Sequence, residues 1–263
     1  MILDNISRAL KEQNWLAAAI EFVIVIFGVV IGFQIQAWNE SRAAAAQGVV
    51  NLALVRDEVK GHVEAYAEMT ERAQSRVTAI NYLINATTDP TSVAANPIEL
   101  PHDLVRARFR TYQAPNRVVY EGLESRGAMA LMPTARIVSE LRTYYQEIGS
   151  WDIVFGEDKT AIIQFETASA GYLTGPQMEA LYADNAASTP AFENFGAEQS
   201  VGLARRLSED REFMKWLHEL YDHHRGIRDM SHWQEKESRS MVVRINEVLG
   251  EDSADLAATE PAS

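Results

Sequence analysis

The sequence predicts an all-α protein in which one N-terminal transmembrane helix continues into a stalk helix and is followed by an irregular helical-bundle soluble domain. Three observations carry this prediction. A long apolar run begins near residue 15, and the segments after it repeat their apolar residues every three or four positions, as amphipathic helices do. Strands typically alternate polar and apolar residues between turn signals, and no stretch of the sequence shows this pattern.

The predicted transmembrane helix covers residues 15–38. Its sequence is almost entirely apolar, and about 20 such residues suffice to cross a hydrocarbon core. Tryptophan favours the interface between lipid and water, so we expect Trp15 and Trp38 to anchor the two ends. The apolar run is longer than that of a secretory signal, and a polar segment separates it from the small residues Ala43–Ala46. An uncleaved signal anchor is therefore favoured over a cleaved signal peptide.

Four residues of this helix share one side. Because successive residues turn by about 100°, Glu21, Gly28, Gly32 and Asn39 form a single stripe. The two glycines make a small-x-x-x-small pattern, and a carboxylate that faces lipid is costly. We expect the stripe to contact a helix of a second copy or of another membrane protein. The alternative is that Glu21 snorkels to the nearby boundary and the glycines make no contact.

Membrane orientation follows from the basic residues. Arg8 and Lys11 precede the span in the short segment 1–14, and Arg42 alone follows it closely. The positive-inside tendency then puts the N-terminus in the cytoplasm and the body outside. In a Gram-negative cell this means a single-pass protein of the inner membrane with a periplasmic body.

Composition excludes several classes of function. The 263 residues include 37 acidic and 24 basic side chains, a formal net charge of −13. This balance argues against nucleic acid as a partner and against attraction to anionic lipid headgroups. The chain has no cysteine, which excludes disulfides, thiolate metal sites and cysteine nucleophiles.

The stalk helix is predicted over residues 39–86. This segment contains no proline, and Gly48 and Gly61 are expected to weaken the helix locally without ending it. Its apolar residues recur every three or four positions: Leu52, Val55, Val59, Val63, Tyr66, Met69, Ala73, Val77 and Ile80.

The soluble domain is predicted over residues 87–250, and the small, acidic tail 251–263 is expected to be disordered. Clusters of Pro and Gly divide this domain into helices at about 102–112, 118–127, 133–172 and 198–249, with Pro133 in the first turn of the third. The inner side of the last helix is expected to carry Phe213, Leu217, Leu220, Ile227, Met230 and Val243.

Two segments resemble a family of uncharacterised bacterial single-span membrane proteins. The run from Glu21 to Glu40 is similar to that family's N-terminal signature, which ends Gln-x-x-x-Trp-Asn-Glu, although Ala19-Ile20 replaces its usual glycine. The segment Leu123–Gly127, followed by Tyr144-Tyr145, is similar to its Leu-x-Ser-x-Gly motif and tyrosine-containing helix. The resemblance implies a helical body on one span, and it implies no enzyme, cofactor or catalytic residue. We interpret Ser125-x-Gly127 as a structural turn in which Gly127 is a left-handed cap.

Two local clusters have residue types that bind ligands. Glu219 and His223 lie four positions apart on a predicted helix and have the chemistry to share a metal, but solvated side chains are the favoured interpretation. Arg106, Arg108 and Arg110 form a basic patch, for which pairing with the acidic body is favoured over an anionic ligand.

The favoured hypothesis is a non-enzymatic membrane-anchored scaffold or accessory subunit that assembles through its span and its helical body. The sequence contains neither a nucleophile elbow nor a glycine-rich phosphate loop, so we predict no enzyme activity, no catalytic residue and no cofactor. The alternative is an extracytoplasmic ligand-binding sensor that acts through a separate partner. In that case Tyr144, Tyr145, Trp151 and Arg142 are the candidate ligand contacts.

Overall fold

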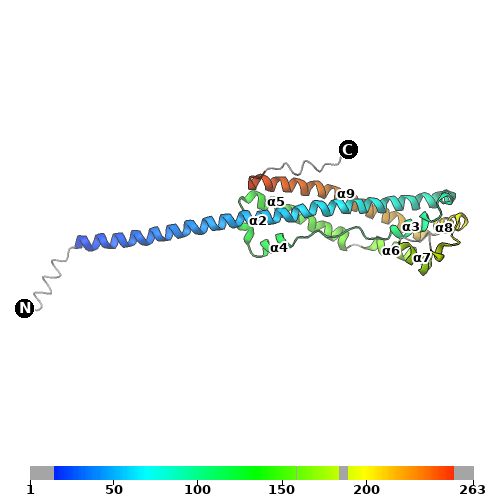
Figure 1. The fold of residues 1–263 in the computed structure, drawn as a ribbon, viewed down its shortest axis with the longest axis horizontal. Coiled ribbons are helices and arrows are strands. Elements are labelled where there is room, and N and C mark those ends of the chain that lie inside the picture. The colour runs from blue at the N-terminus through cyan, green and yellow to red at the C-terminus, as the bar shows by residue number, and fades with distance from the viewer. Residues whose placement is uncertain (1–14, 158, 184–188, 252–263) are drawn as a thin grey trace, which may run out of the picture.

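The computed structural model describes residues 15–157, 159–183 and 189–251 of the chain. Every regular element within these ranges is a helix, which confirms the predicted all-α class. One very long helix runs through the molecule, and the other elements gather around its second half (Figure 1). The predicted segment 1–14 and all but the first residue of the predicted tail 251–263 lie outside the described residues.

Helix α2 is this long helix, and it spans Trp15–Thr88 without a break. Its 74 residues correspond to a length of about 110 Å. The side chains described before Gly48 are exposed, apart from a partly buried Ala44, whereas the inner side of the helix is buried from Gly48 onward. The predicted stalk 39–86 therefore needs correction, because only its first turns stand free and the rest forms part of the body's core.

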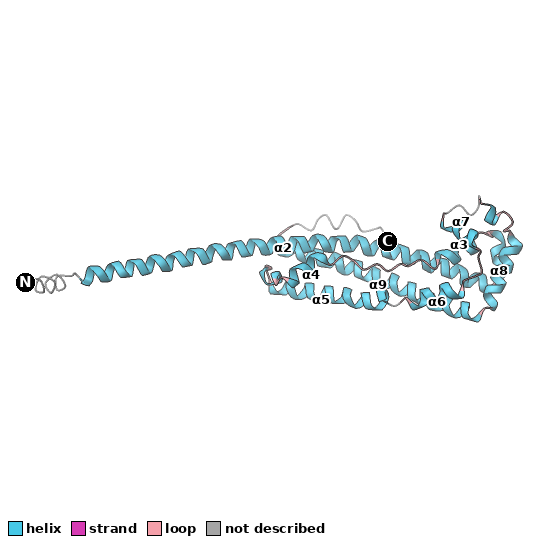
Figure 2. Cartoon of the chain, turned by 90° about the horizontal axis from the view of Figure 1, so that it is seen from below, coloured by secondary structure: helices cyan, strands magenta, loops and turns pink. Residues whose placement is uncertain are grey.

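Helix α9, Arg211–Leu249, runs antiparallel to α2 along the whole body (Figure 2). On the side where the two helices face each other, each has a buried residue at every seventh position, and this seven-residue repeat is that of a coiled coil. On α2 this series is Leu52, Val59, Tyr66, Ala73 and Ile80, and on α9 it is Leu217, His224, Ser231, Ser238 and Ile245.

The periodicity of α2 was predicted correctly, since all nine of the residues expected on its inner side are buried. On α9 the expected inner residues are buried except Val243, which is only partly covered. Val242 and Ile245 take its place against α2.

The core has two large apolar clusters, one at each end of the α2–α9 pair. At the end where α2 enters the body, α4 (Val118–Ser125), the 3-10 turn η2 (Ala128–Leu131) and α5 (Ala135–Trp151) pack against the two long helices. At the far end the partners are η1 (Pro90–Ala95), α3 (Glu99–Arg106), α6 (Thr160–Ala168), α7 (Gly175–Tyr182), η5 (Pro190–Phe192) and α8 (Ala197–Glu209). A smaller cluster around Tyr66 lies between them.

The helix predicted over 133–172 is in fact two helices. Helix α5 ends at Trp151, a π-helical turn η3 follows at Asp152–Glu157, and α6 begins only at Thr160. The start was also misplaced, because Thr134 caps α5 by accepting a hydrogen bond from the Ile137 amide, and this leaves Pro133 outside the helix.

The helix predicted over 198–249 is also divided. Helix α8 ends at Glu209, and the carboxylate of Asp210 accepts hydrogen bonds from the amides of Glu212 and Phe213 to begin α9.

Two other expectations agree more closely with the structure: α4 matches the helix predicted over 118–127, and Gly127 has the left-handed φ of 68° expected of a cap. Helix α3 begins and ends earlier than predicted.

Gly48 marks the point where α2 enters the body. A Cβ atom at this position would lie 1.8 Å from the carbonyl oxygen of Leu131, so the turn after α4 can approach the helix only because residue 48 has no side chain. At Gly61, on the same helix, a Cβ atom would meet nothing within 4 Å.

We predict that Gly48→Ala destabilises the body by about 1–3 kcal/mol, because the turn at Leu131 must move away. Urea unfolding of the detergent-solubilised protein measures this effect. Gly61→Ala is the matched control and should be neutral or stabilising by up to about 1 kcal/mol, because alanine is the better helix former. Equal stability of the two variants would contradict the close contact.

Candidate functional site

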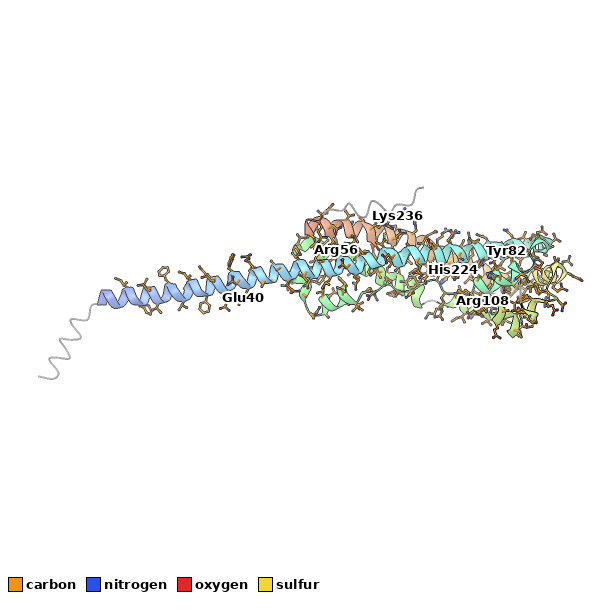
Figure 3. All side chains as sticks on the ribbon, viewed as in Figure 1. Glu40, Arg56, Tyr82, Arg108, His224 and Lys236 are labelled. Carbon is orange, nitrogen blue, oxygen red and sulfur yellow. The ribbon has the colours of Figure 1, made fainter. Side chains whose placement is uncertain are left out.

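The first candidate site is the free part of α2. Its large apolar side chains from Ile20 to Trp38 are 44–67% exposed, and no described residue of the body packs against them. In Figure 3 the side chains of this segment, including Glu40, project away from the helix with no neighbouring element. Within the described ranges, α2 is the one helix long and apolar enough to span a membrane.

The predicted contact stripe lies on this free segment. A Cβ atom on Gly28 or Gly32 would meet nothing within 4 Å, and Asn39 is exposed. Glu21 belongs to α2, but its side chain lies outside the described part of the structure. No residue of this stripe therefore has a tertiary partner in a single chain, as far as the structure describes it.

Of the two predicted tryptophan anchors, only Trp38 has a side chain that the structure describes. The indole of Trp38 is 59% exposed, and the guanidinium of Arg42 lies over its ring at 4.9 Å from the centroid. This pairing leaves a cationic group at the interface end of the apolar segment, where an amphipathic ring is favoured. Trp15 begins α2, and its side chain is not described.

The continuity of α2 relates this stripe to the body. At about 100° per residue, Asp57 points the same way as Asn39, and Tyr66 points the opposite way. Tyr66 is 0% exposed and faces the core, whereas the Asp57 side chain is 61% exposed. The stripe therefore continues along the side of α2 that faces away from the body, where Val50 is 51% exposed.

The second candidate site is a buried polar cluster around Glu58, in the half of the α2–α9 pair that is nearer to the free part of α2. One oxygen of the Glu58 carboxylate accepts hydrogen bonds from the Tyr120 amide at 3.1 Å and the Tyr145 hydroxyl at 2.7 Å. The other accepts from the Val119 amide at 2.6 Å. A side chain of α2 thus caps the N-terminus of α4, where amides lack partners and the helix dipole favours a negative charge.

His62 lies one turn further along α2 and links three other elements. Its Nδ1 is 2.8 Å from the Tyr144 hydroxyl, and its Nε2 pairs with the Asn116 carbonyl. The Tyr144 hydroxyl is in turn 2.8 Å from the hydroxyl of Ser238 on α9. The histidine is 1% exposed, and burial lowers its pKa.

The tyrosines of this cluster are held as neutral groups. Burial raises the pKa of Tyr145, and its hydrogen bond to the Glu58 carboxylate raises it further. Burial also raises the pKa of Tyr120 to about 12, and the Tyr120 and Tyr145 rings stack at 3.9 Å between centroids. The hydroxyl of Tyr145 is bonded to Glu58, and that of Tyr144 to His62 and Ser238, so these hydrogen bonds link α5 to α2 and α9.

Comparison with family models, with curated proteins and with solved structures finds no match to this chain. Its function is therefore argued from the two sites and from the cavities around them.

The four residues predicted to line a ligand site do not share one. Tyr144 and Tyr145 are buried in the cluster just described, and the Trp151 ring stacks on Phe155 further along the body. Arg142 is exposed and lies 3.9 Å from Glu124. Only Arg142 and Tyr145 border the same surface hollow, so the structure corrects the expected common site.

Glu219 and His223, for which solvated side chains were favoured over a shared metal, belong to no group of three or more metal-ligating side chains among the described residues. Within the described ranges, one such group has its ligand atoms close together: Glu99, His102 and Asp103. The guanidinium of Arg106 already occupies this group, since it lies 2.7 Å from Asp103 and 2.8 Å from His102 Nδ1. The cluster is therefore an ion-pair network whose cation is an arginine.

The three arginines predicted as one patch point to different places. Arg106 pairs with the acidic cluster of α3, as the favoured interpretation expected. Arg108 donates instead to the carbonyl and the hydroxyl of Ser169, which ties the loop after α3 to the end of α6. Arg110 is exposed and borders a cavity beside the π-helical turn.

Sequence reasoning missed Glu58 and His62. The position of His62 carried a signal, because it lies between Val59, Val63 and Tyr66 on the inner side of a strongly periodic helix. Glu58 carried none, because its amide partners belong to a helix that is distant in sequence.

We predict that Glu58→Gln destabilises the body by about 1–3 kcal/mol, because the amide nitrogen of glutamine cannot accept the hydrogen bonds that the second carboxylate oxygen accepts. Chemical unfolding followed by far-UV circular dichroism measures the loss. Glu64→Gln, at an exposed position of the same helix, should stay within about 0.5 kcal/mol of the unmodified protein. A similar small effect at Glu58 would rule out its capping role.

A second prediction concerns how the stability of the body falls at acid pH. His224 is 0% exposed, and burial lowers its pKa to about 3, so the unfolded chain takes up a proton below pH 6.5 that the folded body does not. Stability should therefore fall by about 2 kcal/mol between pH 7 and pH 5 through this residue.

The measurement compares unfolding free energies at the two pH values for the unmodified protein and for His224→Gln. The variant should lack this part of the acid sensitivity, while the contribution of His62 and the opposing one of Asp103, whose pKa burial raises to about 6, remain in both. An identical pH dependence of the two proteins would contradict the neutral, buried state of His224.

Proposed function

We propose that this protein is a non-enzymatic, membrane-anchored scaffold or accessory subunit. It crosses a bacterial inner membrane once, with its N-terminus in the cytoplasm and its helical body in the periplasm. It assembles with a second copy or with another membrane protein through the stripe of Glu21, Gly28, Gly32 and Asn39.

The observation that carries this proposal is the unbroken course of α2. One face of this helix is covered by α9 throughout the body, and the opposite face is exposed from Gly28 to Gly61. A partner helix that meets the glycines within the membrane can therefore continue along α2 without meeting the body. The body would then be held at a set angle to the membrane, because no hinge interrupts the helix.

Small side chains outside the membrane support the same contact. Residues 43–46 are all alanine, and Val50 follows on the same side as Asn39. Small residues at a helix interface let two backbones approach closely. Further along, Asp57, Glu64 and Glu68 are exposed on this face, so like charges would end a parallel contact between two copies.

The alanine run allows a direct test, since its four positions point in four directions about 100° apart. The chain has no cysteine, so single substitutions give no background. We predict that Ala43→Cys and Ala46→Cys form disulfide-linked species when native membranes are oxidised, because both lie near the stripe. Ala44→Cys and Ala45→Cys are matched controls on other sides of the helix and should not cross-link.

The mass of the cross-linked species identifies the partner. Twice the mass of one chain indicates a second copy, and another mass indicates a different membrane protein that has a cysteine of its own at the contact. Introducing Gly28→Leu and Gly32→Leu should abolish cross-linking, whereas Val30→Leu on the opposite side should not. Equal cross-linking at all four alanine positions would overturn the proposed contact, and absence of cross-linking at all four would exclude a contact with a second copy.

A further inference from the structure

The side of α2 that faces away from the body stays apolar for some distance beyond the apolar segment. Val50 is 51% exposed on this side and Leu54 is 48% exposed. No charged residue occurs from Ala43 to Val55, which is a length of about 18 Å along the helix. Apolar surface that a single chain leaves exposed often marks a contact with another protein. We define the free face of α2 as the residues that point within about 40° of the direction of Asn39.

The charged residues on the free face are all acidic. Helical geometry puts these residues on it: Glu21, Asp57, Glu64, Glu68 and Glu71. The side chains from Asp57 onward are exposed, and Glu21 lies within the apolar segment. The free face therefore presents carboxylates at two levels, separated by small and apolar residues.

Two of these carboxylates have a partner within the chain. Asp57 lies 3.1 Å from Arg56, and Glu68 lies 3.7 Å from Arg72. Both carboxylates remain largely open to solvent, since their side chains are 61% and 67% exposed. Exposed ion pairs of this kind are weak, so they leave both carboxylates free to pair with a partner's cation.

Glu64 and Glu71 have no cation within ion-pair distance among the described residues. The exposed Lys60 lies about 60° to one side of the face. Side chains outside the described part of the structure do not alter the sign of the face, because every charged one after Lys11 is acidic. They add negative charge wherever they lie.

This charge pattern argues against a second copy as the partner. Two parallel copies in one membrane place each residue of the free face opposite its own counterpart, so carboxylates face carboxylates at both levels. Like charges across an interface cost free energy and suppress the wrong partner. A helix of a different protein that carries Lys or Arg at these levels gains ion pairs instead, including one for Glu21, whose charge is costly in a membrane without a partner.

A hollow of about 300 Å³ beside Gly61 gives a basic side chain room at the upper level. It lies between α2 and the loop before α4, and Asp57, Glu68 and the small Ala65 border it. Arg72, the described cation in its lining, is the partner of Glu68. A Cβ atom on Gly61 would meet nothing within 4 Å, so packing within the chain does not require glycine there. The glycine leaves the backbone of α2 open to a partner's side chain.

We propose that the free face binds a helix of a different membrane protein, which carries Lys or Arg opposite Glu21 and opposite the carboxylates from Asp57 to Glu71. Between these levels its facing residues are small or apolar. The upper carboxylates extend over about 21 Å of α2, so basic residues three or four positions apart on one helix meet them. This inference rests on the proposed assembly through α2 and specifies the chemistry of the partner.

The first test asks whether the protein assembles with itself. Ala130→Cys, an exposed position outside the free face, is labelled with donor or acceptor dye and reconstituted alone in phosphatidylcholine bilayers. Energy transfer should stay at the level of unassociated proteins. Higher transfer that Gly28→Leu and Gly32→Leu abolish would identify a second copy at this contact. That result would overturn this inference and leave the proposed assembly through α2 intact.

The second test uses a synthetic helical peptide of about 26 residues that represents the partner outside the membrane. One face carries alanine and leucine, followed by lysines spaced to meet the carboxylates from Asp57 to Glu71. Fluorescence anisotropy measures its binding to the full-length protein in nanodiscs of phosphatidylcholine. The peptide should bind at least about tenfold more tightly than the same peptide with glutamate in place of lysine.

The combined variant Glu64→Gln, Glu68→Gln and Glu71→Gln should weaken binding of the lysine peptide at least about tenfold. Each exposed ion pair changes an affinity by up to about fivefold, and three are removed together. A neutral amide of nearly the same shape keeps the helix and its packing.

The matched control removes three carboxylates from one exposed side of α9, through Glu219→Gln, Asp222→Asn and Asp229→Asn. It should change binding of the lysine peptide by less than about twofold. An equal loss in the two variants would show attraction to the overall negative charge and would overturn the proposal. Equal binding of the lysine and glutamate peptides, or no binding of the lysine peptide, would overturn it as well.

Discussion

The antiparallel pairing of α2 with α9 holds the body together, because it joins the first described helix to the last and most other elements pack against this pair, while α7 packs on α3. The contact combines three apolar clusters, one at each end and a smaller one around Tyr66, with buried polar side chains between them: His62, Ser231, Gln234 and Ser238. Apolar residues at heptad positions drive two helices together, whereas polar ones at the same positions cost stability and restrict the register. The register of α9 along α2 is therefore restricted by the hydrogen-bonded link from His62 through Tyr144 to Ser238.

This pairing also gives the free part of α2 its direction. Because the 74 residues of α2 form one unbroken helix, the side that α9 covers in the body fixes the direction in which the proposed contact stripe faces. Gly48 is the residue at which the free part of α2 ends and the packed part begins, because the backbone of the turn at Leu131 contacts the helix there. A rigid connection of this kind suits a protein that positions its body beside a membrane partner.

The polar groups of the body serve structure more than chemistry. Glu58 caps α4 from a neighbouring helix, Asp210 caps α9, and Arg106 neutralises the acidic cluster of α3. Each of these groups is already satisfied by other residues of the body, which leaves little unused reactivity in the described chain.

By itself, the sequence determined the class of fold, the apolar segment and the inner side of α2, because these depend on composition and on a periodicity that any helix imposes. The helical phase that puts Gly28, Gly32 and Asn39 on one stripe is likewise a property of the chain alone. Only the tertiary structure decided that most of the expected stalk is core, that α5 stops at a π-helical turn and that Asp210 separates α8 from α9. Only it brought Glu58 to α4 and Arg110 to the cavity wall, because such contacts join residues far apart in sequence, and no local pattern encodes which surfaces meet.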